Sequence, residues 1–131
     1  MTGSAGGPGP PLVLIAEDER PIAAILRAVV ADAGYEPAVA THGRQALELA
    51  RERWPALVIT DLMMPYLGGD ELIAALRTEA EARGRAAPPV ILMTAAGLHR
   101  AHLAGADAVL RKPFDLDDLE TVLRRLLPPR A

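Results

Sequence analysis

Short runs of consecutive apolar residues alternate along the chain with segments in which apolar residues recur every three or four positions. The runs are typical of strands buried on both faces of a sheet, and the recurring pattern is typical of amphipathic helices. The runs predict strands at residues 12–16, 35–40, 56–60, 89–94 and 108–111. The recurring pattern predicts a helix from Ile22 to a stop at Gly34 and helices over 43–54, 69–84, 98–104 and 116–126, the one at 98–104 being short.

Strand and helix follow each other five times, which predicts one α/β domain. Apolar strands separated by helices form a parallel sheet covered on both faces, and right-handed crossovers make it doubly wound. Pro37 has no N–H to give to a central ladder, so the strand at 35–40 is expected at an edge of the sheet. Asp115 stands where it can cap the last helix. Ligands of such sheets bind beyond the carboxyl ends of the strands.

Composition and charge narrow the class of protein. The 131 residues are 50% hydrophobic and carry a net charge of −3, so neither nucleic acid nor an anionic membrane is expected as a direct partner. The chain has no cysteine, which removes disulfides, thiolate catalysis and cysteine-based zinc sites. It has no apolar run of about 18 residues and no signal-peptide pattern, so we expect a cytoplasmic protein.

The two ends of the chain differ from the rest. Residues 1–11 are mostly Gly, Pro, Ala and Ser and are expected to form a disordered N-terminal tail. Pro128 and Pro129 cannot continue the helix before them, which leaves residues 128–131 as a C-terminal tail. The folded domain is therefore expected to span residues 12–127.

Polar side chains follow the buried strands where each strand ends. Glu17 and Asp18 follow the first, Asp61 follows the third, Thr94 closes the fourth and Lys112 follows the fifth. The carboxyl ends of parallel strands share one edge of the sheet, so these groups are expected to converge there. Crowded carboxylates need a counter-charge, and Mg²⁺ prefers oxygen ligands.

This set of groups suits phosphoryl transfer better than other chemistries. The chain has no serine nucleophile paired with a histidine, no glycine-rich phosphate loop and no adenine-binding signal. A carboxylate such as Asp61 can attack phosphorus to form an aspartyl-phosphate. A cation and Lys112 would offset charge on the phosphoryl oxygens, and Thr94 would donate a hydrogen bond.

Four stretches carry a family resemblance. They are "LVLIAEDE", "LVITDLMMP" followed by Gly69, "VILMTA" and "GADAVLRKPF", and each lies at the end of a predicted strand. In this order they resemble the receiver domains of the bacterial two-component response regulators, over residues 12–127. The resemblance implies the flavodoxin-like, CheY-like (βα)5 fold, a five-stranded parallel sheet with strand order 2-1-3-4-5.

The resemblance also implies a phosphoacceptor and a metal site. Asp61 matches the phosphoacceptor of the family, and Asp18 matches the direct ligand of Mg²⁺ (or Mn²⁺). Glu17 matches the acidic partner that acts through water. Met63 matches the residue whose backbone carbonyl binds the metal, beside Asp61.

Two further positions match the switch of the family. Thr94 matches the hydroxyl that turns toward the phosphoryl group, and Lys112 matches the lysine that pairs with the acceptor. A cis bond between Lys112 and Pro113 is implied. The implied phosphoryl donor is a phosphohistidine on a sensor histidine kinase or a histidine phosphotransfer protein, and the implied output is a change in binding to a downstream protein. The receiver would catalyse only its own phosphorylation and dephosphorylation.

The sequence departs from the family pattern in two places. Val109 replaces the usual tyrosine or phenylalanine three residues before the lysine, and the segment from Thr94 to Gly105 is about one helical turn shorter than usual. The fourth helix is therefore expected to be short, skewed or absent, and no dimer of the common kind is expected through the face made by the fourth helix, fifth strand and fifth helix. Met63 and Ala96 occupy the positions that tune dephosphorylation. Neither side chain can hold a water by hydrogen bonding, so the phosphoryl group is not expected to be short-lived.

Other readings remain open. The same fold could serve as a phosphorylation-independent scaffold, which Val109 and the shortened helix favour. A phosphohydrolase with an Asp nucleophile would usually carry a second Asp at the position of Met63. Glu19 is expected to be a solvated acid in the first turn of a helix. His99 and His102 are expected to be surface imidazoles, because no third ligand is placed near them.

Overall fold

The computed structural model describes residues 9–96 and 98–127. Residues 1–8 of the expected N-terminal tail and the whole expected C-terminal tail, residues 128–131, lie outside the described residues. The ten elements follow in the predicted order. They are β1 (Leu12–Ala16), α1 (Arg20–Asp32), β2 (Glu36–Ala40), α2 (Gly43–Glu52), β3 (Leu57–Asp61), α3 (Gly69–Arg83), β4 (Val90–Thr94), α4 (Leu98–Leu103), β5 (Ala108–Arg111) and α5 (Leu116–Leu126).

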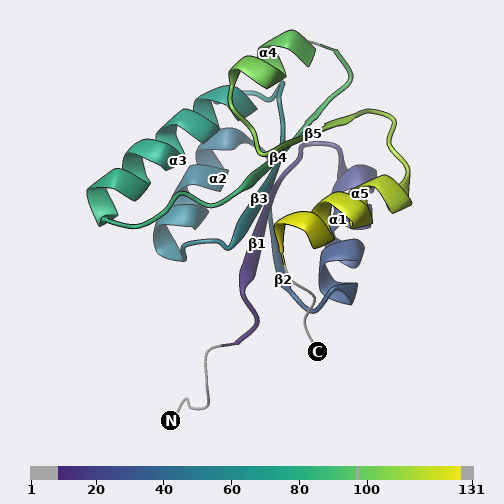
Figure 1. Cartoon of the computed structure of the whole chain (residues 1–131), viewed down its shortest axis with the longest axis horizontal. Helices are drawn as coiled ribbons and strands as arrows, with labels where there is room; N and C mark the ends of the chain where they lie inside the picture. The colour runs from purple at the N-terminus through teal and green to yellow at the C-terminus, as the bar shows by residue number, and fades with distance from the viewer. Residues whose placement is uncertain (1–8, 97, 128–131) are drawn as a thin grey trace.

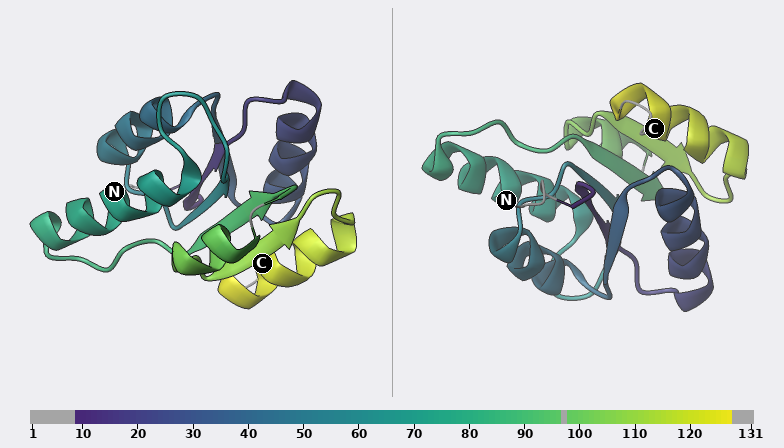
Figure 2. Two further views of the ribbon diagram at one scale, coloured as in Figure 1. Left: turned by 90° about the horizontal axis from the view of Figure 1, so that it is seen from above. Right: turned by 90° about the horizontal axis from the view of Figure 1, so that it is seen from below.

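The five strands form one parallel sheet in the order β2-β1-β3-β4-β5. The order 2-1-3-4-5 and the doubly wound α/β fold are therefore confirmed. Figure 1 shows α1 and α5 together on one face of the sheet and α2 and α3 on the other. The views along the sheet in Figure 2 show the same two layers. The fourth helix has six residues, as its short sequence segment predicts.

Two apolar clusters fill the spaces between the sheet and its helices. Side chains alternate between the faces of a strand, so Val13 and Ile15 of β1 pack in the cluster that contains α1 and α5. Leu14 and Ala16 pack in the other cluster, with α2 and α3. All five residues of β1, β3 and β4 are buried, which explains why their sequences read as continuous apolar runs.

The strand β2 lies at one edge of the sheet, as Pro37 predicts. The Glu36 N–H donates to the Pro11 carbonyl, and the Ala40 carbonyl accepts from the Glu17 N–H, so residues 36 and 40 direct their backbone groups toward β1 and its ends. The intervening Pro37 directs its backbone nitrogen outward, where the missing N–H leaves no ladder bond unmade.

Several helix ends follow local sequence rules, and the start of α5 does not. Pro21 lies in the first turn of α1, where its missing N–H costs nothing, and Gly84 ends α3 with a φ of 63°. Asp115 occupies the N-cap position of α5, but its side chain makes no capping hydrogen bond. The expectation that Asp115 caps α5 through its side chain is wrong in that respect. Among the described residues no helix combines the length and the apolar character needed to span a bilayer.

Candidate functional site

The carboxyl ends of the strands bring acidic side chains from distant parts of the sequence together. Glu17 follows β1 and Asp61 ends β3, and both are buried, with exposed fractions of 1% and 6%. Oxygens of Glu17, Glu19 and Asp61 lie within 4.8 Å of one another. Among the described residues, this is the one group of three side chains that could together hold a metal ion. The sheet topology therefore produces the acidic edge that the sequence predicts.

Lys112 is the counter-charge of this group. Its Nζ lies 2.7 Å from Oδ1 of Asp61, 2.9 Å from Oε1 of Glu17 and 3.4 Å from Oε2 of Glu19. The side chain of Lys112 is 14% exposed, so these ion pairs are partly shielded from solvent. The Lys112–Pro113 peptide bond is cis, as the family resemblance implies.

The contacts in this site shift two pKa values. Burial opposes the charge of Lys112, but hydrogen bonds to Asp61 and Glu17 outweigh it and raise the pKa of the amine well above its ordinary value. Burial, followed by the hydrogen bond to Asp61, raises the pKa of Glu17 against the lowering effect of Lys112. The lysine therefore stays charged, while the ionisation of Glu17 is disfavoured.

Thr94 ends β4 at the same edge and is buried, with 3% of its surface exposed. Its hydroxyl donates to the carbonyl of Ala96 and accepts from the N–H of Ala96 at 3.1 Å. The Thr94 carbonyl accepts from the N–H of Lys112 at 2.8 Å. In this state the Thr94 hydroxyl therefore hydrogen-bonds both backbone groups of Ala96. The backbone of Thr94 is bonded to Lys112, which also pairs with Asp61.

The three acids at 17–19 lie differently from what the sequence predicts. Asp18, predicted as the direct metal ligand, has an exposed side chain and is outside the group of three carboxylates. Glu19 is at the N-cap position of α1 instead of in the first turn, and it contacts Lys112. The Glu19 N–H donates to Oε2 of Glu17 at 3.0 Å, which turns Glu19 back over the site. The expectation that Glu19 is only a solvated acid is therefore wrong, although its side chain is 61% exposed.

Met63 lies in the loop between β3 and α3 with an exposed side chain. The base of this loop is fixed, because the Leu62 N–H donates to the Met93 carbonyl and the Gly69 N–H donates to the Leu62 carbonyl. A Cβ on Gly69 would overlap the carbonyl oxygen of Asp61, so only glycine allows α3 to begin this close to the end of β3. Sequence reasoning identified Gly69 as part of a motif but gave no reason for it.

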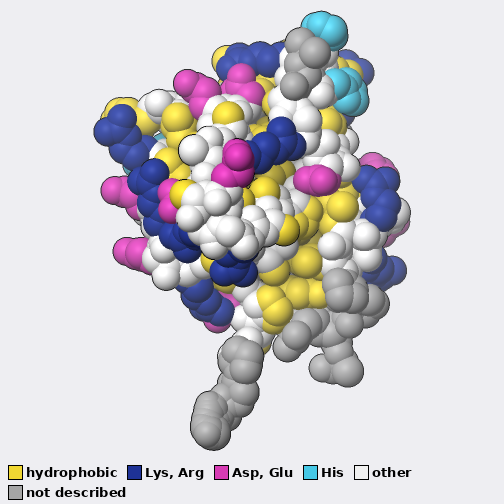
Figure 3. All heavy atoms as spheres, turned by 60° about the vertical axis from the view of Figure 1, so that its left-hand side comes forward, with side chains coloured by type: hydrophobic (Ala, Val, Ile, Leu, Met, Phe, Trp, Pro, Cys, Tyr) yellow, Lys and Arg dark blue, Asp and Glu magenta, His cyan; other side chains and the backbone are white. Residues whose placement is uncertain are grey.

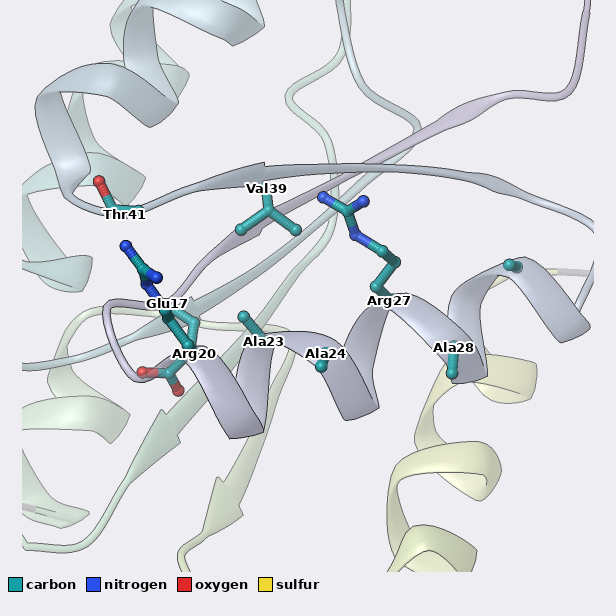
Figure 4. Close-up of a pocket in the computed structure, with 9 residues that line it drawn as sticks. Glu17, Arg20, Ala23, Ala24, Arg27, Ala28, Val39 and Thr41 are labelled. Carbon is teal, nitrogen blue, oxygen red and sulfur yellow. The ribbon is translucent and has the colours of Figure 1, made fainter.

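Two grooves adjoin the site. One, of about 410 Å³, runs between α1 and β2, and Glu17 lies at its inner end. Figure 4 shows Arg20 reaching from α1 toward Thr41 and Arg27 reaching toward the strand that carries Val39. The other groove, of about 490 Å³, is mostly apolar and is lined by α1, by Lys112 and by the start of α5. Ile25 and Leu116 line it and are 46% and 49% exposed.

The remaining predicted positions lie away from the carboxylates. Val109 is partly buried on β5 and packs against the cluster on the α3 side. His99 and His102 lie on α4 with exposed side chains, and Figure 3 shows histidine side chains at the top of the molecule, where Figure 1 places α4.

Comparison with known proteins identifies the family of the chain. The family model for the response regulator receiver domain matches residues 13–124. The response regulator Rre1 of Synechocystis is 33% identical over 120 residues, which cover 88% of this chain and 51% of that protein. The phosphate regulon transcriptional regulatory protein PhoB of Klebsiella pneumoniae is 32% identical over 124 residues, covering 88% and 53%. The chain thus spans about half the length of the curated relatives it matches.

Solved structures give the same family. The signal receiver domain of a signal transduction histidine kinase from Syntrophus aciditrophicus has a TM-score of 0.79 at 30% identity, with 89% of each chain covered. The chemotaxis protein CheY4 of Vibrio cholerae has a TM-score of 0.78 at 28% identity, covering 91% of this chain and all of the other. On sequence, fold and the convergence of acids on one lysine, the chain belongs to the response regulator receiver family of two-component signalling.

Proposed function

We propose that this chain accepts a phosphoryl group on Asp61, from a phosphohistidine of a sensor histidine kinase or a histidine phosphotransfer protein, and thereby switches its binding to a downstream protein. The observation that carries the proposal is the pairing of a buried Asp61 with Lys112 at 2.7 Å inside a group of three carboxylates. Receivers are signalling phosphoacceptors, and Asp61 is a buried carboxylate held by the Lys112 ammonium.

The proposed transfer is a displacement at phosphorus. An oxygen of Asp61 attacks the phosphorus of the phosphohistidine, the new O–P bond forms as the P–N bond breaks, and the electron pair of that bond stays on the imidazole nitrogen. Lys112 is then placed to pair with a phosphoryl oxygen instead of the carboxylate. The hydroxyl of Thr94 would leave Ala96 and donate to a second phosphoryl oxygen.

The donor set suits a hard divalent cation, since Mg²⁺ and Mn²⁺ take carboxylate and carbonyl oxygens. Asp61 and Glu17 would hold it, Glu17 through water, and either Asp18 after a rotation of its side chain or Glu19 would complete the acidic ligands. The backbone carbonyl of Met63 is the proposed neutral ligand. When bound, the cation would offset charge on the transferring phosphoryl group.

The apolar groove beside Lys112 is where we propose that the phosphoryl donor docks. A donor must bring its imidazole within bonding distance of Asp61, and this groove adjoins the site on the side of Lys112. Exposed Ile25 and Leu116 supply apolar area that a helical partner could cover. The yeast phosphotransfer protein Ypd1 is known in a complex with the receiver domain of Ssk1, which has a TM-score of 0.80 to this chain at 25% identity. A cytoplasmic location goes with such partners.

Intact mass spectrometry after incubation with acetyl phosphate and Mg²⁺ tests the proposal. The expected result is a mass gain of one phosphoryl group, which is lost in Asp61→Asn and when the divalent cation is chelated. Asp32→Asn, a change at the exposed end of α1, is the matched control and should keep the gain.

A second candidate function is a scaffold of the same fold that works without phosphorylation. Val109, which replaces the usual aromatic residue, and the six-residue α4 favour it. The absence of any mass gain in the wild-type protein would contradict the phosphoacceptor proposal and leave the scaffold. The hydrolase alternative has little support, because Met63 offers no acidic group two residues after Asp61.

A further inference from the structure

The short α4 is fastened to α3 at both of its ends. At the start, Arg100 pairs with Asp70 in the first turn of α3 through two bonds, Nε to Oδ2 at 2.9 Å and Nη2 to Oδ1 at 3.1 Å. At the end, Arg77 of α3 donates to the carbonyl of Gly105 at 2.6 Å and to that of Ala104 at 3.4 Å. Two parallel bonds from a guanidinium to a carboxylate fix both distance and orientation.

Arg100 also contacts the loop that follows Asp61. Its remaining nitrogen, Nη1, lies 3.4 Å from the sulfur of Met63. Asp70 follows the same loop at its other end, directly after Gly69. One side chain of α4 thus contacts Met63 near the start of this loop and Asp70 just beyond its end. The Arg100 guanidinium lowers the pKa of Asp70, so the carboxylate of this ion pair is charged at neutral pH.

On its N-terminal side, α4 follows closely after Thr94, the last residue of β4. Only residues 95–97 separate Thr94 at the end of β4 from Leu98 at the start of α4. The Thr94 hydroxyl is bonded to both backbone groups of Ala96 within this connection. If the hydroxyl turns toward a phosphoryl group on Asp61, Ala96 loses both bonds, which permits a movement of α4, whose first residue is Leu98. The Arg100–Asp70 ion pair then resists it.

We propose that the Arg100–Asp70 ion pair between α4 and α3 holds α4 in its resting position and sets how readily phosphorylation of Asp61 moves it. The second half of this statement rests on the proposed function. The output of this receiver would then be a movement of α4 against α3, on the side of α4 away from α5. Arg100 is a positioning residue in this scheme and does not touch the reacting atoms.

Hydrogen–deuterium exchange of the unphosphorylated protein tests the first half. Arg100→Gln removes the ion pair and keeps a polar side chain of similar length. We expect amide exchange of the peptide covering residues 98–105 to rise about two- to five-fold, the range that an exposed ion pair supports. The charge-reversed double variant, Arg100→Asp with Asp70→Arg, is expected to return exchange toward the wild-type rate. Arg124→Gln breaks the comparable exposed pair with Glu120 on α5 and is the matched control. Equal exchange in the wild-type protein and Arg100→Gln would overturn the proposal.

Phosphorylation by acetyl phosphate tests the second half. At a limiting concentration of acetyl phosphate, Arg100→Gln is expected to reach a phosphorylated fraction higher than that of the wild-type protein, because less resistance opposes the movement of α4. Faster exchange with an unchanged phosphorylated fraction would show that the ion pair is structural only and would overturn the coupling. If the wild-type protein gains no phosphoryl group, the proposed function and the coupling both fail, and the exchange result still decides whether the ion pair holds α4.

Discussion

Lys112 is the only lysine of the chain, and its single amine contacts three carboxylates from two different segments. A guanidinium could also pair with these acids, but a compact ammonium with rotatable donors can move from a carboxylate to a phosphoryl oxygen with little change of its stem. The other cations of the chain are arginines, and several of them form surface ion pairs. A lysine at 112 therefore suits the proposed phosphoryl transfer, in which this charge changes partners.

The raised pKa of Lys112 gives a chemical prediction. A protonated amine is not a nucleophile, so Lys112 should acylate more slowly than an unpaired lysine at every pH up to its ordinary pKa of 10.5. The rate should keep rising with pH beyond that value, where the rate of an unpaired lysine levels off, because the folded-state pKa is the higher one. Treatment with an N-hydroxysuccinimide ester followed by peptide mass analysis measures this at one site, without interference from other lysines.

Urea-unfolded protein is the control for this measurement, since unfolding removes both burial and the carboxylates. Equal acylation rates in the folded and unfolded protein at pH 8 would contradict the ion-paired state of Lys112.

A second residue-scale prediction concerns the lifetime of the phosphoryl group. The side chains of Met63 and Ala96 offer no strong hydrogen-bonding group to hold an attacking water. We expect slow release of inorganic phosphate from the purified phosphoprotein, and faster release from Met63→Asn, whose amide can orient water. Ala74→Asn, on an exposed position of α3, is the control for adding an amide. Rapid release from the wild-type protein would contradict the prediction.

At the scale of elements, the start of α3 is set by Gly69. Because a Cβ there would overlap the Asp61 carbonyl oxygen, Gly69→Ala must push α3 away from β3 or displace the end of β3. We expect a loss of about 1–3 kcal/mol in the free energy of unfolding, the usual cost of overpacking a well-filled site, together with slower phosphorylation of Asp61. Urea denaturation and the intact-mass assay measure the two effects. Gly9→Ala, where nothing lies within 4 Å, should change neither.

The short α4 leads to a prediction about association. Many receivers dimerise through α4, β5 and α5, but here α4 has six residues and β5 carries Val109 in place of an aromatic residue. We expect the protein to form no conventional two-fold dimer through this face after phosphorylation. Sedimentation velocity with and without acetyl phosphate measures this. A phosphorylation-dependent dimer that is broken by charge reversal at exposed Arg111 of β5 would show the prediction to be wrong.

At the scale of the whole molecule, the fold could be predicted from the sequence because buried strands and amphipathic helices each leave a distinct apolar pattern along the chain. β1 and the first residues of β3 and β4 are apolar because helices cover both faces of these strands. Pro37 located the sheet edge, and the spacing between Thr94 and Gly105 gave the length of α4. These features depend on backbone hydrogen bonding and on the period of the pattern, which are local properties.

The details of the site were less accessible to sequence reasoning. The neighbouring acids at 17–19 point in different directions. Their directions depend on the turn after β1, in which the Glu19 N–H donates to the Glu17 carboxylate. The Arg100–Asp70 contact joins residues thirty positions apart and depends on how α4 lies against α3. The position of Asp115 was predicted correctly, but its missing capping bond depends on a side-chain rotation that the sequence pattern does not determine.

The orientation of Pro37 has a consequence for the protein at high concentration. Among the described residues, the outer side of β2 has no partner strand, and an open strand edge is a template on which further chains can add to a sheet. Pro37 removes a donor from that side, so an incoming strand could not complete its bonds there. Pro37→Val is therefore expected to increase light scattering at high protein concentration, whereas Ala38→Val, whose backbone faces β1, is not. If the domain binds a phosphoryl donor and an output protein in turn, as proposed above, Pro37 would also keep β2 from pairing with another copy of the chain.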